Sequence, residues 1–207
     1  MVRRLFVMKG NTIKPIQDFT MLQQQVAAGN KDAFRIIFDT LFSNLVKFSF
    51  SFVQSKEASI EIVDEIFVQL WTKRHGIVQI LDLRVYLYTA TKNASLNYIA
   101  KRAKQIQAEP YDYIEVQIAD CAATPEQVMI SKELMLQIKA AIDSLPPRCK
   151  LVFKLIREDG LKYAEVANVL GLSAKTVENQ MLIAISKIKE ALKGKLLVPR
   201  HKIFLKK

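Results

Sequence analysis

The chain has 207 residues, of which 50% are hydrophobic, and a formal net charge of +11 at pH 7. This length allows one or two small domains, and the hydrophobic share is sufficient for packed cores. The two cysteines form no CxxC motif and the two histidines have no ligand spacing, which argues against a disulfide framework, a metal site or any other cofactor. The basic charge favours a polyanionic partner, either nucleic acid or an anionic membrane surface.

No segment of the chain is expected to cross a membrane. The first residues, MVRRLFVMKG, contain a basic pair, but their apolar run is too short for a signal peptide. The apolar-rich segment 33–53 carries Arg35, Asp39 and Lys47, which argue against a membrane span. We therefore expect a soluble cytoplasmic protein.

The first half of the chain has the hydrophobic periodicity of helices. A short helix is predicted around Phe19, Leu22 and Val26, and it ends near Gly29. A long core helix follows, with an apolar stripe at Phe34, Ile37, Phe38, Leu41, Leu45, Phe48 and Phe52. The pattern then predicts a third helix over Ser59–Lys73, a loop over Thr72–Asp82 and a fourth helix that Asp82 caps and that runs to about Arg102.

Helical periodicity is lost between Ala103 and Ala123, a stretch that contains Pro110. We interpret it as a linker and divide the chain into a first domain over 1–103, a flexible linker over 104–123, a second domain over 124–195 and a basic tail over 196–207. Thr124 is the expected N-cap of the second domain's first helix, which extends to Pro146. A further helix is predicted from Pro147 to about Glu158.

The segment Leu161–Leu192 has the pattern of a helix-turn-helix. Tyr163, Val166, Ala167 and Leu170 are expected to form one buried face of a helix, and Gly171 ends that helix because glycine adopts the left-handed cap conformation without penalty. The next helix is capped by Ser173 and has an inner face of Val177, Met181, Ala184 and Ile188. Such a motif holds one helix out for the DNA major groove. The predicted fold is therefore all-α, with two small helical domains.

Two separate segments resemble one protein family. The sequence "AAIDSLPPRCKLVFKLIREDGLKYAEVANVLGLSAKTVENQ" is similar to region 4 of the extracytoplasmic-function (ECF) sigma factors, the group 4 members of the sigma-70 family. In the first half, "IEIVDEIFVQLWTKR" resembles region 2.2 of that family, and "LRVYLYTATKNASLNYIAKRAKQ" resembles regions 2.3 and 2.4. The resemblance covers the chain from about Ala27 to Lys193. It implies a sigma factor that directs promoter recognition, DNA melting and transcription initiation, and that is not an enzyme.

The resemblance also implies macromolecular partners and no small-molecule substrate. Core RNA polymerase is expected to bind through its β′ clamp and β flap, and an anti-sigma factor is expected to cover the binding faces. The β′ clamp would meet the outer face of the third helix at Glu61, Asp64, Glu65 and Gln69. Many family members have glutamine where this chain has Asp64.

The predicted loop and fourth helix should contact the minus-ten promoter element. Exposed rings can stack unpaired bases, and cations can follow the phosphates. Asn93 is the strongest single candidate, because an amide both donates and accepts. The spacing of Tyr86 and Tyr88 predicts that one of the two rings packs in the core. The candidates are Lys73, Arg74, Arg84, Tyr88, Lys92, Asn93, Asn97, Lys101 and Arg102.

The second helix of the helix-turn-helix should read the minus-thirty-five element. Asn179 is suited to adenine, Glu178 to a cytosine amine and Leu182 to a thymine methyl, although Leu182 equally suits a protein contact. Many relatives have arginines where this chain has Gln180, Ile183 and Ile185. The candidates are Ser173, Lys175, Thr176, Glu178, Asn179, Leu182 and Ser186.

Three other classes of protein are alternatives to a sigma factor. The main alternative is a stand-alone helix-turn-helix regulator whose N-terminal domain binds a ligand or dimerises. A nucleic-acid enzyme is disfavoured because the sequence has no phosphate loop, nucleophile elbow or metal-ligand spacing. A membrane-surface protein would need exposed apolar helix faces, whereas these faces fit two packed cores.

Overall fold

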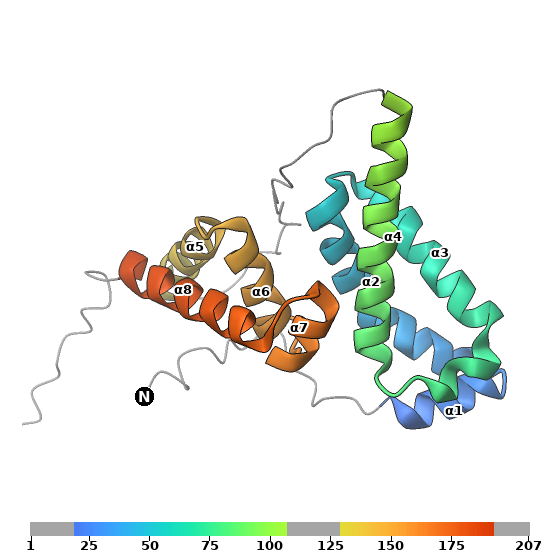
Figure 1. Cartoon of the computed structure of the whole chain (residues 1–207). Coiled ribbons are helices and arrows are strands. Elements are labelled where there is room, and N and C mark those ends of the chain that lie inside the picture. The colour runs from blue at the N-terminus through green and yellow to red at the C-terminus, as the bar shows by residue number, and fades with distance from the viewer. Residues whose placement is uncertain (1–18, 107–128, 193–207) are drawn as a thin grey trace, which may run out of the picture.

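A computed structural model describes residues 19–106 and 129–192, and within those ranges every regular element is helical. The first domain contains α1 (Thr20–Ala27), α2 (Lys31–Val53), α3 (Lys56–Thr72), the 3₁₀ helix η2 (Arg74–Gln79) and α4 (Leu83–Ile106). The second contains α5 (Met129–Asp143), α6 (Pro147–Arg157), α7 (Tyr163–Leu170) and α8 (Ala174–Leu192). Figure 1 shows the two helical groups side by side, and the predicted all-α fold is confirmed.

Helix α2 is the central element of the first domain and packs against α1, α3 and α4. Ile37, Leu41 and Leu45 from its predicted stripe are buried. Phe34 and Phe38 extend the core through ring contacts with Phe67 of α3. The Phe34 ring also lies 5.0 Å from the ring of Trp71, which packs against the core.

Among the described helices, α2 is also the one whose length and composition would allow it to cross a membrane. Its buried residues instead form the centre of the first domain, as the apolar stripe predicts for a core helix.

Local capping explains where several helices begin. The Asn30 Oδ1 accepts hydrogen bonds from the backbone nitrogens of Asp32 and Ala33, which starts α2. The Ser55 Oγ accepts from Ala58 N, so α3 begins at Lys56 rather than at the predicted Ser59. The Asp82 Oδ1 accepts from Val85 N, as predicted for the cap of α4.

The described residues allow only part of the predicted domain limits to be compared with the structure. Helix α4 continues to Ile106, past the predicted limit of 103, and the rest of the predicted linker lies outside the described residues, as do Thr124 and the basic tail. The predicted loop 72–82 contains η2, a short helix that the broken periodicity around Gly76 did not reveal.

The second domain buries the predicted inner face of α8. Val177, Met181, Ala184 and Ile188 are all buried where α8 packs on α5, α6 and α7. Val166 and Ala167 are buried as expected, whereas the expectation for Tyr163 was wrong. Tyr163 is the first residue of α7 and is exposed, because the helix starts there and no preceding turn covers the ring.

Gly171 forms the turn of the helix-turn-helix, with φ of +69°. A Cβ atom at this position would meet nothing within 4 Å, so the cost of a side chain there is conformational only. We expect Gly171→Ala to lower the free energy of unfolding by about 1–2 kcal/mol, the cost of a left-handed non-glycine residue. Chemical denaturation measures this loss. Gly76→Ala is the matched control, because its Cβ is also unhindered and its φ is not positive; an equal loss in both variants would contradict the explanation.

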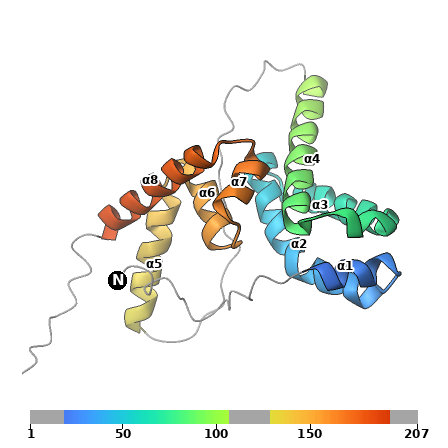
Figure 2. The ribbon, with the colours of Figure 1, turned by 60° about the horizontal axis from the view of Figure 1, so that its bottom comes forward.

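The two domains touch where α7 and the turn before it meet α4. Figures 1 and 2 both show this end of α7 beside the N-terminal half of α4. The contact joins segments more than 70 positions apart, since Arg84 donates to the backbone oxygen of Asp159 across |i−j| = 75.

Candidate nucleic-acid interface

The outer face of α8 carries the residues predicted to read the minus-thirty-five element. Lys175, Glu178 and Asn179 are exposed in its first turns, opposite the buried inner face. Leu182 and Ser186 continue the same exposed face. The structure therefore brings the predicted readers together on one helix surface, at the end that a helix-turn-helix directs into the major groove.

Four of the predicted residues already have local partners, in two pairs. The Ser173 Oγ accepts from Thr176 N at 3.0 Å and hydrogen-bonds the Thr176 hydroxyl at 2.8 Å, so this pair caps α8. The Lys175 Nζ lies 2.8 Å from the Glu178 Oε2. Because exposed ion pairs contribute little stability, DNA can displace this pair at small cost. Asn179 belongs to neither of these two pairs.

Gln180 and Ile185, two of the positions that lack arginine, face the protein. The Cys149 thiol of α6 donates to the Gln180 Oε1 at 2.8 Å, and burial raises the pKa of that thiol. Ile185 packs against the core, whereas Ile183 is exposed beside Leu182. The apolar patch expected on α8 thus consists of Leu182 and Ile183.

We expect Asn179→Ala to relax selectivity at one base pair of the upstream element. A good bidentate contact discriminates by about 1–3 kcal/mol, so the preferred base should lose roughly 5- to 150-fold of its advantage. Transcription from a promoter library randomised upstream, with core polymerase present, measures this. Asn168→Ala is a control for removal of an exposed amide elsewhere in the same domain. Selectivity unchanged at every upstream position would reject the role of Asn179.

On α4, three of the candidates for the minus-ten element form one exposed stripe. Asn93, Asn97 and Lys101 are separated by four residues each and share one helix face, where all three are exposed. Arg102 is exposed next to Lys101, and Lys92 is half-buried. The same stripe extends to Tyr86, seven residues before Asn93, whose ring is 47% exposed. The seven-residue spacing between Tyr86 and Asn93 could have indicated from the sequence that Tyr86 belongs to this exposed stripe.

The expectation that the Tyr88 ring stacks an unpaired base is wrong for this structure. Tyr88 is only 1% exposed, and its ring lies 5.1 Å from that of Phe48 in the core. One of the two tyrosines was expected to be buried, and Tyr88 is that one. Among the described residues its hydroxyl has no hydrogen-bond partner of standard geometry. Burial, and after it the nearby Asp159 carboxylate, raises the Tyr88 pKa well above its ordinary value.

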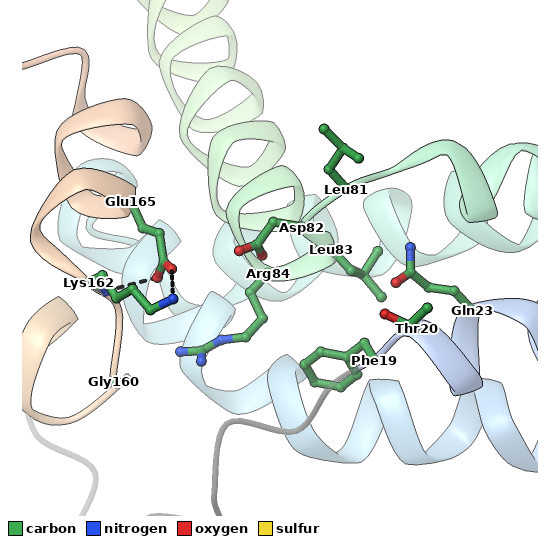
Figure 3. A pocket seen from close by; sticks show the side chains of 10 residues that line it. All are labelled: Phe19, Thr20, Gln23, Leu81, Asp82, Leu83, Arg84, Gly160, Lys162 and Glu165. Atoms are coloured by element: carbon green, nitrogen blue, oxygen red, sulfur yellow. Dashed lines mark hydrogen bonds and ion pairs between the residues drawn. The ribbon is translucent and has the colours of Figure 1, made fainter.

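Arg84 and Asp159 form the contact between the two domains. The Arg84 guanidinium donates to the backbone oxygen of Asp159 rather than facing solvent. Burial raises the pKa of the Asp159 carboxyl from 3.8 to about 7, against the opposing effects of Tyr88, Arg84 and Lys47. Figure 3 shows the Arg84 side chain directed toward Gly160, with Lys162 and Glu165 beyond it. In this arrangement the second domain covers one predicted DNA contact, Arg84.

A cavity of about 320 Å³ lies beside this contact. Phe19, Thr20 and Gln23 of the first domain line one side, and Gly160, Lys162 and Glu165 of the second line the other. The Lys162 backbone nitrogen donates to Glu165 at 2.8 Å, which closes the start of α7. Within residues 19–106 and 129–192, no group of three or more His, Cys, Asp or Glu side chains could hold a metal ion.

At the end of α3, the two predicted cations differ. Lys73 is exposed, whereas the Arg74 guanidinium lies 5.0 Å from the centre of the Trp71 ring and its Nη1 donates to the Trp71 oxygen. Arg74 thus packs on Trp71, and of the two cations Lys73 is the one whose side chain is accessible to a phosphate.

The predicted polymerase face of α3 is a single exposed stripe. Glu61, Asp64, Glu65 and Gln69 are all exposed, and the Gln69 side chain donates to the Glu65 Oε1 at 2.9 Å. Val68 is also exposed within this stripe. Val68 was not among the residues predicted from the sequence. An apolar residue at an outer position of the helix could have indicated it.

Known proteins resemble the chain in both halves. The model of the family "Sigma-70, region 4" matches residues 135–188. The "ECF RNA polymerase sigma-E factor" of Escherichia coli (strain K12) is 22% identical over 170 residues, covering 79% of this chain and 88% of that protein. The "ECF RNA polymerase sigma factor SigE" of Mycolicibacterium smegmatis is 32% identical over 97 residues, covering 46% of this chain and 37% of that protein.

A solved structure is similar in fold. The structure of CnrH in complex with the cytosolic domain of CnrY has a TM-score of 0.50 and 21% sequence identity, and the match covers 84% of this chain and 96% of CnrH. The region 4 match runs from within α5 to within α8 and so includes most of the helix-turn-helix, and the sigma-E alignment extends across both helical domains. Together with the two-domain helical fold, these matches support the identification of the chain as an ECF sigma factor of the sigma-70 family, with a role in transcription initiation.

Proposed function

We propose that this protein binds core RNA polymerase and directs it to promoters through two separate DNA contacts. The observation that carries this proposal is the pair of exposed polar stripes, Asn93–Lys101 on α4 and Lys175–Ser186 on α8, in two domains of one basic chain. The stripe on α8 would read the upstream element in the major groove. The stripe on α4, with the Tyr86 ring and Lys73, would hold unpaired bases and phosphates of the downstream element.

We further propose that the exposed stripe of α3 binds the polymerase β′ clamp and that the second domain meets the β flap. Glu61, Asp64 and Glu65 give this stripe a negative charge in an otherwise basic chain. Complementary charge sets orientation and speeds encounter more than it adds affinity. The protein acts in the cytoplasm as a binding subunit without catalytic activity of its own.

An anti-sigma factor is the proposed inhibitory partner. CnrH has been solved in complex with the cytosolic domain of CnrY, which supports a protein partner for this fold. The patch of Leu182 and Ile183 on α8 is exposed and apolar, as a protein contact requires.

Run-off transcription tests the main proposal. The purified protein is mixed with core polymerase and genomic DNA fragments, and the transcript starts are sequenced. We expect starts that depend on the protein and share two upstream sequence elements. A stand-alone regulator would instead shift duplex DNA by itself as a dimer and add no new starts, which would overturn the proposal.

A further inference from the structure

The segment between α3 and α4 presents two apolar side chains to solvent. Val78 at the end of η2 and Leu81 just before α4 are both exposed, and Leu81 is fully so. Figure 3 shows Leu81 directed away from Gln23 and Thr20 of α1. Apolar side chains on DNA-binding proteins can insert between bases and separate them. The position of this segment at the start of α4 places it next to the proposed downstream contact.

A buried amide from α1 holds the backbone of this segment. The Gln23 Nε2 donates to the Ile77 oxygen at 2.7 Å and to the Ile80 oxygen at 2.8 Å, across 54 and 57 positions of sequence. Both hydrogens of the amide nitrogen are therefore used. Gln23 is 5% exposed, and Ile77 beneath it is buried in the core.

These two hydrogen bonds explain why a polar side chain occupies a buried position. Burial of an amide is costly unless its groups are hydrogen-bonded. If only packing mattered at this position of α1, an apolar residue would serve equally well. The Gln23 bonds instead determine the path of the chain on both sides of Val78. Asp82 anchors the other end, since its Oδ1 accepts from Val85 N at 3.0 Å.

We propose that Gln23 is a positioning residue for promoter opening, because it holds the 77–81 backbone in the conformation that presents Val78 and Leu81 to the unpaired strand. This inference rests on the proposed function, since it assigns Gln23 to the downstream contact. Gln23 itself touches no DNA. Its effect on DNA is exerted through the Ile77 and Ile80 carbonyl groups.

The test compares Gln23→Met with Gln24→Met in reconstituted holoenzyme. Methionine keeps the length of the side chain but cannot donate, and Gln24 is an exposed neighbour on the same helix. We expect Gln23→Met to slow open-complex formation on duplex promoters about tenfold and to flatten the base preference in the downstream element, with core polymerase affinity within about twofold of wild type. Hydrogen exchange should rise at residues 77–81 and stay unchanged in α2. Gln24→Met should behave as wild type in every measurement.

A purely structural role for Gln23 would give a different result. It would lower thermal stability and polymerase affinity in proportion to the loss of opening and leave the base preference intact, which would overturn the inference. If Gln23→Met does not fold, Leu81→Asp decides, because this side chain is fully exposed and its replacement spares the core. The inference predicts a roughly five- to tenfold loss of opening for Leu81→Asp, the scale of one lost base contact, and wild-type opening would reject it.

The same experiment separates this inference from the proposed function. If the wild-type protein supports no promoter opening with core polymerase, the proposed function fails. If the wild type opens promoters and Gln23→Met and Leu81→Asp both match it, only the positioning role of Gln23 fails.

Discussion

Lowering the pH from about 8 to about 5 is expected to tighten the contact between the two domains. Asp159 is the group responsible, because its carboxyl is buried at the contact and its pKa is raised from 3.8 to about 7. A carboxyl whose pKa is raised by the contact binds its proton more strongly when the domains touch. The contact is therefore most stable below about pH 4, loses stability as the pH rises to about 7, and changes little above that.

The size of this effect follows from the pKa difference. At about 1.4 kcal/mol for each pH unit between 3.8 and about 7, the linkage amounts to about 4 kcal/mol if the carboxyl becomes fully hydrated on separation. The charged and titratable groups that face Asp159 are Arg84 and Tyr88 of α4, Lys47 of α2 and its neighbour Glu158. Of these, Tyr88, Arg84 and Lys47 favour the carboxylate, so the pKa is raised mainly by burial of Asp159 and to a lesser extent by the Glu158 charge.

Energy transfer between dyes on α1 and α8 measures the domain separation as a function of pH. Wild type should show more of the closed arrangement at low pH, whereas Asp159→Asn should stay closed across the range because its side chain carries no charge. Glu158→Gln is the matched control, since it removes an exposed carboxylate at the adjacent position and should keep a pH dependence. Its midpoint should move to slightly lower pH, because the Glu158 charge contributes to the raised pKa of Asp159. A pH dependence that survives in Asp159→Asn would show that another group is responsible.

Replacing Asn93 with alanine should lower open-complex formation by about tenfold or more, the equivalent of roughly 1.4 kcal/mol, with polymerase affinity nearly unchanged. Asn93 is exposed in the middle of the α4 stripe, so the folded domain should tolerate the change. The lost amide would have donated to and accepted from the edge of an unpaired base. Fluorescence of 2-aminopurine placed in the downstream element reports the opening.

A premelted promoter isolates the step at which Asn93 acts. If Asn93 stabilises the open strand, Asn93→Ala should also bind the premelted promoter less tightly than wild type. Gln25→Ala, which removes an exposed amide from α1, controls for loss of a surface side chain. Opening of duplex DNA equal to that of wild type would remove Asn93 from the downstream site.

Features that depend on nearby residues could be predicted well. The inner face of α8 follows from the spacing of Val177, Met181, Ala184 and Ile188, and the turn before it follows from Gly171. Helix caps depend on one or two side chains within a few residues, as Asp82 illustrates. The exposed stripes on α3, α4 and α8 follow in the same way, because helical periodicity assigns the outer face once the inner face is known.

Contacts between distant segments could not be predicted from the pattern. Tyr88 has the same aromatic character as Tyr86, and only the packing of Phe48 and the Asp159 turn decides which of the two rings is covered. Gln23 looks like a surface glutamine beside Gln24 and Gln25, but the backbone of Ile77 and Ile80 makes it a buried anchor. The same holds for Gln180, whose partner is the Cys149 thiol of another helix.

The amino-acid sequence by itself determined the all-α class, the two-domain order, the helix-turn-helix and the resemblance to ECF sigma factors, because these depend on local periodicity, caps and contiguous motifs. Only the tertiary structure decided which candidate DNA contacts are accessible, that Arg84 and Asp159 join the domains, and that the 77–81 backbone is anchored from α1. The Gln23 and Arg84 hydrogen bonds join residues separated by 54 to 75 positions, and no local pattern encodes such pairings.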